Sequence, residues 1–321
     1  MNRDKAMLAT AYRYFLAVAE AGSIRGASDE LNVAASAVNR QILQLEAALG
    51  IPLFERVGRG LRLSEAGRVL RGHLRRAVSD YQGVSSELDA LRGLQRGKVS
   101  LATVESVSVS LLPEILAAFW ATLPGIEVTA RVASSDAVTQ LVRAREADLG
   151  FTFNPPSLDG LEVIYERAFT ISALMSAGHP LAGRRSLSLD DCLEYPIALP
   201  ARGLSLRTAL EPALASKAAK TGEIRPRIES NSLRIMASLA RHEALIAFQT
   251  VVGIERELAA EDLVARPLSD PDIAADRLMV IHERRREPNL AVASFIDFLV
   301  ARLNDRKLRT IWSKHAVCRR N

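Results

Sequence analysis

The N-terminal hundred residues carry side chains that suit hydrogen bonding to nucleic acid better than catalysis. Ser36, Asn39 and Arg40 are spaced so that they fall on one face of a predicted helix. An arginine can donate to both O6 and N7 of guanine, and an asparagine can bond an adenine edge or a phosphate. The spacing alone is equally compatible with an ordinary solvent-exposed helix face.

A second basic group surrounds a Gly-Arg-Gly sequence. Residues 51–63 are expected to form two short strands joined at residues 58–60, with arginines that suit contact with the DNA phosphate backbone. This Gly-x-Gly does not predict a dinucleotide site, because the third glycine and the acidic partner are absent. The DNA-contacting residues are expected to be Ser23, Arg25, Ser36, Asn39, Arg40, Arg56, Arg59 and Arg62.

Polar residues also follow the predicted strands of residues 98–303. Ligands of open α/β sheets bind beyond the carboxyl ends of the strands, although any single serine or threonine there can instead cap a helix. A carboxylate at Glu105 disfavours an anionic ligand unless Arg202 offsets it, which favours a ligand with amine or hydroxyl groups. The expected ligand-binding residues are Thr103, Glu105, Ser106, Ser134, Ser135, Phe153, Asn154, Arg202, Ser205 and Gln249.

No side-chain pattern indicates catalysis, a metal or a cofactor. The five histidines are scattered without metal-ligand spacing, and no P-loop is present. Residues 203–207 (GLSLR) lack the last glycine of a nucleophile elbow. Cys192 and Cys318 form neither a disulfide framework nor a metal-binding pattern. We therefore expect a protein that is not an enzyme and has no cofactor.

Three helices are predicted to position the N-terminal polar residues. Apolar periodicity predicts helices over residues 9–21, 24–31 and 35–49, with glycine ending the first and third. A short helix, a tight turn and a second helix with a polar outer half is the helix-turn-helix plan, whose second helix enters the major groove. The inner stripe of the third helix is expected to contain Val38, Ile42, Leu45 and Leu49.

A long helix is predicted to begin after Ser64, its N-cap. Its apolar residues recur at alternating spacings of four and three, as in a coiled-coil heptad. One interpretation is a dimerisation helix that presents two reading heads to a two-fold DNA site; the other is a single helix packed on a neighbouring domain. The expected dimer contacts are Leu70, Leu74, Tyr81, Leu88 and Leu91, with Ala77 and Val84 between them.

The rest of the chain is predicted to form two α/β lobes. Strands over residues 99–104, 126–132 and 148–153 alternate with helices over 111–121 and 137–144, which argues for a parallel sheet covered by helices. The pattern repeats over residues 169–248. The crossovers between lobes are expected near residues 165–168 and 263–268.

Length and charge agree with this division. A chain of 321 residues with 48% hydrophobic content predicts two or three globular domains. Residues 1–97 carry a net charge of +4 and residues 98–301 one of −5, so only the N-terminal part is expected to meet a polyanion, although +4 is modest. The tail, with +6 over residues 302–321, is expected to be a solvated extension, with added attraction to DNA as the alternative. Without an evident secretory signal or membrane-spanning run, we expect a cytoplasmic protein.

In combination these motifs resemble the LysR-type transcriptional regulators. Residues 14–23 (YFLAVAEAGS) resemble the first helix and turn of that family, and residues 36–42 (SAVNRQI) are similar to its recognition helix. Residues 53–56 (LFER) and 63–67 (LSEAG) resemble its wing and the start of its linker helix. Residues 34–37 (AASA) stand where the family often has Ser-Gln-Pro-Ala, so the recognised DNA sequence does not transfer.

The resemblance implies an α+β protein with a winged helix-turn-helix (1–63), a linker helix and hinge (64–97), a two-lobed α/β effector domain like a periplasmic binding protein (98–303) and a basic tail (304–321). It implies a sequence-specific transcriptional regulator that binds double-stranded DNA, a small-molecule effector between the lobes, and further copies of itself as a dimer or tetramer. The alternatives are a solute-binding protein and an architectural DNA-binding protein without an effector. The helix-turn-helix argues against the first, and the large α/β body argues against the second.

Overall fold

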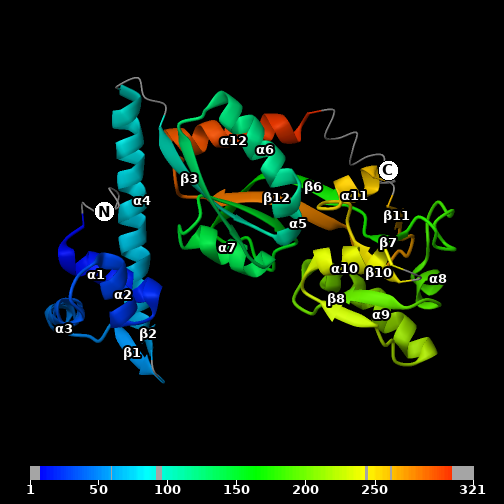
Figure 1. The fold of residues 1–321 in the computed structure, drawn as a ribbon, viewed down its shortest axis with the longest axis horizontal. Helices are drawn as coiled ribbons and strands as arrows, with labels where there is room; N and C mark the ends of the chain where they lie inside the picture. The colour runs from blue at the N-terminus through cyan, green and yellow to red at the C-terminus, as the bar shows by residue number, and fades with distance from the viewer. Residues whose placement is uncertain (1–7, 59, 92–95, 243–244, 261, 306–321) are drawn as a thin grey trace. The chain divides into compact units, whose positions relative to one another are not determined.

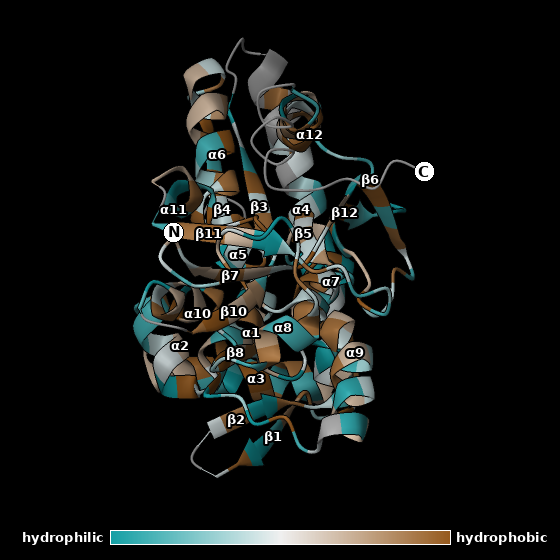
Figure 2. Cartoon of the chain, turned by 90° about the vertical axis from the view of Figure 1, so that its right-hand side faces the viewer, coloured by the Kyte–Doolittle hydropathy of each residue, from teal (hydrophilic) through white to brown (hydrophobic). Residues whose placement is uncertain are grey.

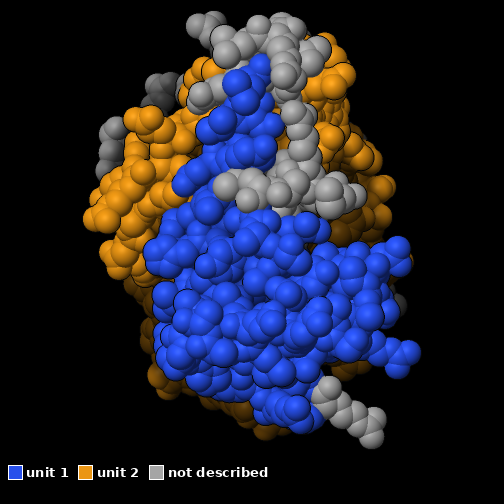
Figure 3. All heavy atoms as spheres, turned by 90° about the vertical axis from the view of Figure 1, so that its left-hand side faces the viewer, with its two compact units in different colours: residues 1–93 blue, residues 94–321 orange. Residues whose placement is uncertain are grey.

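The computed structural model describes residues 8–58, 60–91, 96–242, 245–260 and 262–305 (Figure 1). The chain divides into two compact units, residues 1–93 and 94–321, which are coloured separately in Figure 3. In the described part of the first unit, a helical bundle is followed by a hairpin and a long helix. Its elements are α1 (Thr10–Ala21), α2 (Ile24–Leu31), α3 (Ala35–Leu49), β1 (Phe54–Val57), β2 (Gly60–Leu63) and α4 (Glu65–Leu91).

The bundle forms as its apolar periodicity predicts, with one exception. Val38, Ile42 and Leu45 of α3 are buried in a core that also contains Phe15 of α1. Leu49 was expected on the same stripe, but 46% of its surface is exposed. It is the last residue of α3 and lies past the turns that pack on α1 and α2, so the prediction for Leu49 is wrong.

The hairpin is held to the helices through its backbone amides. Glu46 Oε1 accepts hydrogen bonds from the amides of Leu53 (2.7 Å) and Phe54 (3.2 Å). The Leu61 amide donates to the carbonyl of Gly22 at 2.8 Å, in the turn where Gly22 has a φ of 64°. These bonds fix the hairpin against α3 and the α1–α2 turn.

A capped first turn joins α4 to the hairpin. Ser64 Oγ accepts from the amide of Gly67 at 3.0 Å and donates to the carbonyl of Pro52 at 2.7 Å. A Cβ at Gly67 would lie 2.1 Å from the carbonyl oxygen of Leu53, so only glycine permits this approach. The start of α4 is therefore part of the N-terminal core.

The heptad seam of α4 divides into two parts. Leu74 is buried in the N-terminal core and Leu70 packs against it, so both serve the alternative interpretation, packing within the unit. Further along, Tyr81 is half-buried, while Val84 and Leu88 are 50% and 53% exposed. The side chain of Leu91 lies outside the described residues.

The second unit contains two five-stranded sheets, each with helices on both faces. In the first lobe α6 and α12 cover one face and α7 the other (Figure 1); in the second lobe α9 and α10 lie on opposite faces. In Figure 2 the strands β7, β10 and β11 are mainly brown, in keeping with their buried apolar residues. The strand orders are β4-β3-β5-β12-β6 and β11-β7-β10-β8-β9.

Each lobe is built from segments that are distant in the sequence. The first lobe contains β3 (Gly97–Thr103), α5 (Glu105–Val109), α6 (Leu111–Thr122), β4 (Ile126–Val132), α7 (Ser135–Arg143), β5 (Leu149–Phe153), β6 (Leu161–Phe169), β12 (Asp276–Glu283) and α12 (Leu290–Leu303). The second lobe contains β7 (Ser172–Ser176), α8 (Leu189–Leu193), β8 (Ile197–Pro200), α9 (Ser205–Thr221), β9 (Ile228–Ser230), α10 (Leu233–Ala240), β10 (Ile246–Gln249), α11 (Glu255–Ala259) and β11 (Leu263–Pro267).

The sheets are mixed rather than wholly parallel. Strands β3, β4 and β5 pair in parallel, but β12 runs antiparallel to β5 and β6. The chain crosses between lobes at residues 170–171 and 268–275, just after the segments predicted for the crossovers. In the described part of the chain, no helix is both long and apolar enough to span a membrane.

Candidate functional site

The predicted DNA-reading residues of α3 share one exposed face. Ser36, Asn39 and Arg40 are all exposed, while Val38 between them is fully buried. The helix ladder and the buried stripe therefore hold these three polar side chains towards solvent at the N-terminal half of α3. This geometry suits insertion into a major groove.

The residues before α3 have different roles. Ser23 is the N-cap of α2, and its Oγ accepts from the amide of Gly26 at 3.0 Å. The first role of this hydroxyl is therefore to cap α2. Arg25, two residues later, is exposed.

The hairpin separates its arginines. Glu55 pairs with Arg62 across the strands, and Arg56 pairs with Leu61. Since successive side chains of a strand point to opposite faces, Arg56 and Arg62 lie on opposite faces of the hairpin. Arg62 also forms an ion pair with Glu55 at 3.0 Å, which reduces its charge towards a phosphate. Arg59 lies outside the described residues.

A cavity of about 600 Å³ opens between the two α/β lobes. Its walls come from the ends of β3, β4 and β5 in the first lobe and of β8, β9 and β10 in the second. Because the carboxyl ends of these strands meet at one edge, they bring residues from distant parts of the sequence together. The lining residues are Val104, Glu105, Ser106, Val132, Ala133, Ser134, Ser135, Phe153, Arg202, Gly203, Leu204, Ser205, Leu206, Asn231, Ser232, Leu233, Thr250 and Asp276.

Three of the predicted ligand-binding residues do not line this cavity. Thr103 is fully buried, with its hydroxyl 3.2 Å from the carbonyl of Val104. Asn154 has a φ of 35° and donates to Asp276 Oδ1 at 2.9 Å, so it ties the end of β5 to the start of β12. Gln249 faces a different pocket. The other seven predicted residues line the cavity between the lobes.

Glu105 joins the lobes. Its Oε1 accepts from Ser232 Oγ at 2.8 Å, and its Oε2 accepts from the amide of Leu233 at 2.7 Å. The carboxylate thus sits at the N-terminus of α10, where a negative charge is favoured. Each oxygen accepts one hydrogen bond from the second lobe and the carboxylate still lines the cavity, so the expectation of an amine or hydroxyl ligand stays a prediction.

A second carboxyl group, that of Asp276, also lines the cavity. Asp276 is 2% exposed and accepts from Asn154. Burial raises its pKa to about 7, against a smaller opposite effect of its hydrogen bond with Ser205. Sequence reasoning missed Asp276 because it is the first residue of β12, the strand that follows the second crossover, and ligand-binding residues were expected only after strands.

Two serines stand at the start of α7. Ser134 is its N-cap and accepts from the amide of Ala137 at 3.4 Å. Ser135 accepts from the amide of Phe153 at 3.4 Å. Both hydroxyl groups remain able to donate a hydrogen bond into the cavity, and Arg202 is exposed on the opposite wall.

Among the residues that the structure describes, neither a metal centre nor a reactive thiol is found. Within the described residues, no group of three or more His, Cys, Asp and Glu side chains is arranged to hold a metal ion. Cys192 is fully buried in the second lobe, and burial raises the pKa of its thiol to about 12. A thiol with this pKa is not a thiolate at neutral pH, so Cys192 is unsuited to redox chemistry.

Two family models match the chain, and curated relatives span its length. The models are "Bacterial regulatory helix-turn-helix protein, lysR family", over residues 10–68, and "LysR substrate binding domain", over residues 92–304. The chain is 24% identical over 293 residues to the HTH-type transcriptional activator CmpR of Synechocystis sp., covering 90% of this chain and 94% of that protein. It is 30% identical over 199 residues to the RuBisCO operon transcriptional regulator of Allochromatium vinosum, covering 62% and 66%.

Solved structures share the fold. A full-length OxyR variant from Pseudomonas aeruginosa matches with a TM-score of 0.68 at 18% identity, covering 91% of this chain and 94% of that chain. Full-length CbnR in complex with its target DNA matches with a TM-score of 0.60 at 21% identity, covering 91% and 98%. The predicted architecture, a helix-turn-helix with a linker helix and two α/β lobes, is thereby confirmed. The chain belongs to the LysR family of DNA-binding transcriptional regulators, which carry an effector-binding domain and are not enzymes.

Proposed function

We propose that the cavity between the lobes binds the small-molecule effector and that its occupancy changes how the chain acts on DNA. The observation that carries this proposal is the position of Glu105. Its carboxylate holds the second lobe to the first at the rim of a cavity of about 600 Å³, a size that suits a metabolite. A ligand can shift the balance between open and closed lobes only by its different affinity for the two.

The lining favours an effector with hydrogen-bond donors and acceptors. The hydroxyls of Ser106, Ser134, Ser135 and Thr250 surround the cavity, and Arg202 lies on one wall. Asp276, on another wall, would accept from an amine or hydroxyl group of the effector. These six residues are the proposed effector contacts.

For DNA, the proposed contacts are Ser36, Asn39 and Arg40 on α3 to base edges and Arg25 and Arg56 to phosphates. Arg62 has a smaller role because Glu55 pairs with it. The likeness to a structure of CbnR with its target DNA supports a DNA-bound form of this fold. We place this activity in the cytoplasm, where bacterial DNA lies.

Self-association is proposed through the exposed part of α4. Val84 and Leu88 recur at heptad spacing and are half exposed, so a second α4 would bury them. The paired chains would present two α3 helices to a two-fold site. A tetramer would require a further contact between effector domains.

The test is a gel-shift titration on the DNA upstream of the chain's own coding region, against a scrambled duplex at near-physiological salt. The expected result is a shift specific to the upstream fragment, which then serves as the operator for screening effectors. Equal affinity for both duplexes would leave only phosphate attraction and would contradict sequence-specific regulation at that site.

A further inference from the structure

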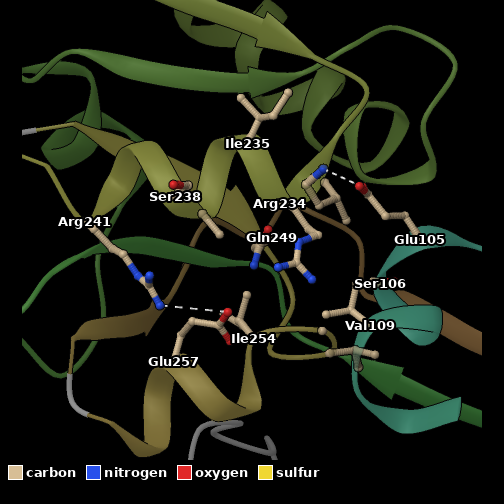
Figure 4. A pocket seen from close by; sticks show the side chains of 14 residues that line it. Glu105, Ser106, Val109, Arg234, Ile235, Ser238, Arg241, Gln249, Ile254 and Glu257 are labelled. Atoms are coloured by element: carbon tan, nitrogen blue, oxygen red, sulfur yellow. Dashed lines mark hydrogen bonds and ion pairs between the residues drawn. The ribbon is translucent and has the colours of Figure 1, made fainter. Parts of the chain in front are cut away.

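A second pocket lies beside the effector cavity and contains a polar group that the protein leaves unsatisfied. The pocket, of about 260 Å³, is bounded by α5 of the first lobe and by α10, α11 and the end of β10 of the second (Figure 4). We call it the α10–α11 pocket. Its polar or charged lining residues are Glu105, Ser106, Arg234, Ser238, Arg241, Gln249 and Glu257.

Gln249 supplies the buried polar group. Its side chain is 2% exposed, and its Oε1 has no hydrogen-bond partner among the described residues. A buried acceptor without a donor costs about 1–3 kcal/mol, and because Gln249 lines the pocket, a rotation of its amide that turns Oε1 into the pocket lets a ligand donor remove this cost. Gln249 therefore indicates a ligand with a hydrogen-bond donor.

Arg234 supplies the complementary charge. It is exposed on α10, and in Figure 4 its guanidinium projects into the pocket together with the Gln249 amide. Figure 4 draws no hydrogen bond or ion pair from Arg234 to the other lining residues. A guanidinium in this position can bind a carboxylate through two parallel N–H donors.

The other charges of the pocket are partly matched. Glu105 is occupied by Ser232 and Leu233, as described above. The guanidinium of Arg241 lies 3.9 Å from a carboxylate oxygen of Glu257 and 3.8 Å from one of Asp262. These separations allow ion pairs but are too long for hydrogen bonds. The pocket thus offers Arg234 to a carboxylate of the ligand and the buried acceptor Gln249 to a hydrogen-bond donor of the ligand.

Close contacts join the lobes beside the pocket. A Cβ at Gly253 would lie 2.7 Å from the carbonyl oxygen of Ser106, so the two lobes touch through backbone there. Glu255 Oε2 accepts from both Ser110 Oγ (2.6 Å) and the Gly253 amide (2.8 Å). These contacts hold the first-lobe and second-lobe sides of the pocket next to each other.

We propose that the α10–α11 pocket is a second ligand site, which binds a small carboxylic acid bearing an amino or hydroxyl group on the adjacent carbon. The carboxylate pairs with Arg234, and the amino or hydroxyl group donates to Gln249 Oε1. A volume of about 260 Å³ is below the usual range of pockets for drug-sized ligands and suits a small acid of this kind.

The second site is placed to influence the first. Glu105, Ser106 and Leu233 line both cavities, so the bond between Glu105 and Leu233 forms part of the wall between them. A ligand of the α10–α11 pocket that favours one arrangement of this wall changes the affinity of the effector cavity for its effector. In return, a bound effector changes the affinity of the α10–α11 pocket for its ligand by the same factor. This coupling rests on the proposed function of the effector cavity; binding itself does not.

Binding is tested by isothermal titration calorimetry of the full-length protein with L-serine, L-lactate and propionate. We expect saturable binding of serine or lactate with a Kd near ~1 mM, and at least about tenfold weaker binding of propionate, which lacks the donor. Gln249→Leu should reduce the affinity for lactate to that for propionate. Arg234→Gln should weaken all three, whereas Arg234→Lys should restore part of the affinity.

Matched substitutions in the effector cavity locate the site. Arg202→Gln and Asn231→Leu make the same chemical changes at exposed positions of the larger cavity and should leave the titration unchanged. The proposal is overturned by the absence of saturable heat at about 10 mM of either acid, or by an Arg202→Gln effect equal to that of Arg234→Gln. Neither readout uses the operator, so a failure of effector control over DNA would not be mistaken for a failure of this site.

Discussion

The amide of Leu233 in the second lobe donates a hydrogen bond of 2.7 Å to the carboxylate of Glu105 in the first. The same carboxylate accepts from Ser232 Oγ at 2.8 Å, so one acidic side chain caps α10 across the space between the lobes. A charged acceptor at a helix N-terminus forms stronger hydrogen bonds than a neutral one. This contact makes the spacing of the lobes sensitive to a single residue.

We predict that Glu105→Gln weakens the contact between the two lobes. The neutral amide can keep one of the two bonds, so the free energy of unfolding should fall by about 1–3 kcal/mol, measured by urea denaturation. Hydrogen exchange at the start of α10 should rise. Glu114→Gln is the control, because Glu114 is exposed on α6 of the same lobe. Equal exchange in both variants would show that Glu105 does not hold α10.

Asp276 predicts a dependence of stability on pH. Its folded pKa of about 7 lies above the ordinary value of 3.8, so the folded state holds its proton more tightly than the unfolded state. This contribution to stability is therefore lost as the pH rises from about 4 to 7, with a slope of at most about 1.4 kcal/mol per pH unit, and is constant above that range. Asp276→Asn should flatten the curve in this window, as followed by denaturation at several pH values; an unchanged slope would exclude Asp276 as its source.

Two glycines of α4 predict opposite effects of the same substitution. At Gly67 a Cβ would lie 2.1 Å from the Leu53 carbonyl oxygen, so Gly67→Ala should destabilise the protein by about 3 kcal/mol. At Gly72 the nearest atom is the Arg76 guanidinium at 3.7 Å, so Gly72→Ala should stabilise by about 0.5–1 kcal/mol. Thermal unfolding of the two variants measures both effects. Melting temperatures that shift in the same direction in both variants would refute the close approach at Gly67.

The exposed part of the α4 seam predicts the effect of a charge on assembly. Leu88→Asp should dissociate the oligomer in sedimentation velocity without unfolding the chain, because Leu88 is 53% exposed. Leu74→Asp would instead place a carboxylate in the N-terminal core and unfold it. Val69→Asp is the control, since Val69 is 56% exposed on the same helix but outside the seam. An oligomer that survives Leu88→Asp would contradict dimerisation through this part of α4.

The exposed face of α3 predicts a loss of operator affinity. Arg40→Ala should weaken specific binding by about 1–3 kcal/mol if Arg40 donates to a base, measured by fluorescence anisotropy at fixed salt. The control is Arg185→Ala, which removes an exposed arginine from the effector domain. A uniform loss on specific and scrambled DNA would instead assign Arg40 to a phosphate.

Local sequence patterns determined most of the secondary structure. The helices of the N-terminal unit follow from apolar periodicity and from Gly22 and Gly50, which adopt the left-handed conformation that ends a helix. The exposed position of Ser36, Asn39 and Arg40 follows equally from spacing, because the buried Val38 and Ile42 fix how α3 is rotated. Such short-range rules need only residues within one or two turns.

Contacts between distant segments were decided by the tertiary structure. Spacing alone gave Leu74 and Leu88 the same heptad role, yet one is buried by the N-terminal core and the other is exposed. Likewise, the sequence pattern predicted Glu105 at the cavity but not its hydrogen bond to the amide of Leu233, 128 positions away. Asp276 enters the cavity only because β12 returns to the first sheet, and Gln249 faces the α10–α11 pocket because α10 and α11 fold over the end of β10. A periodic pattern determines which face of an element is apolar, whereas the partner that covers that face, and the polar groups left without one, depend on how the elements pack together.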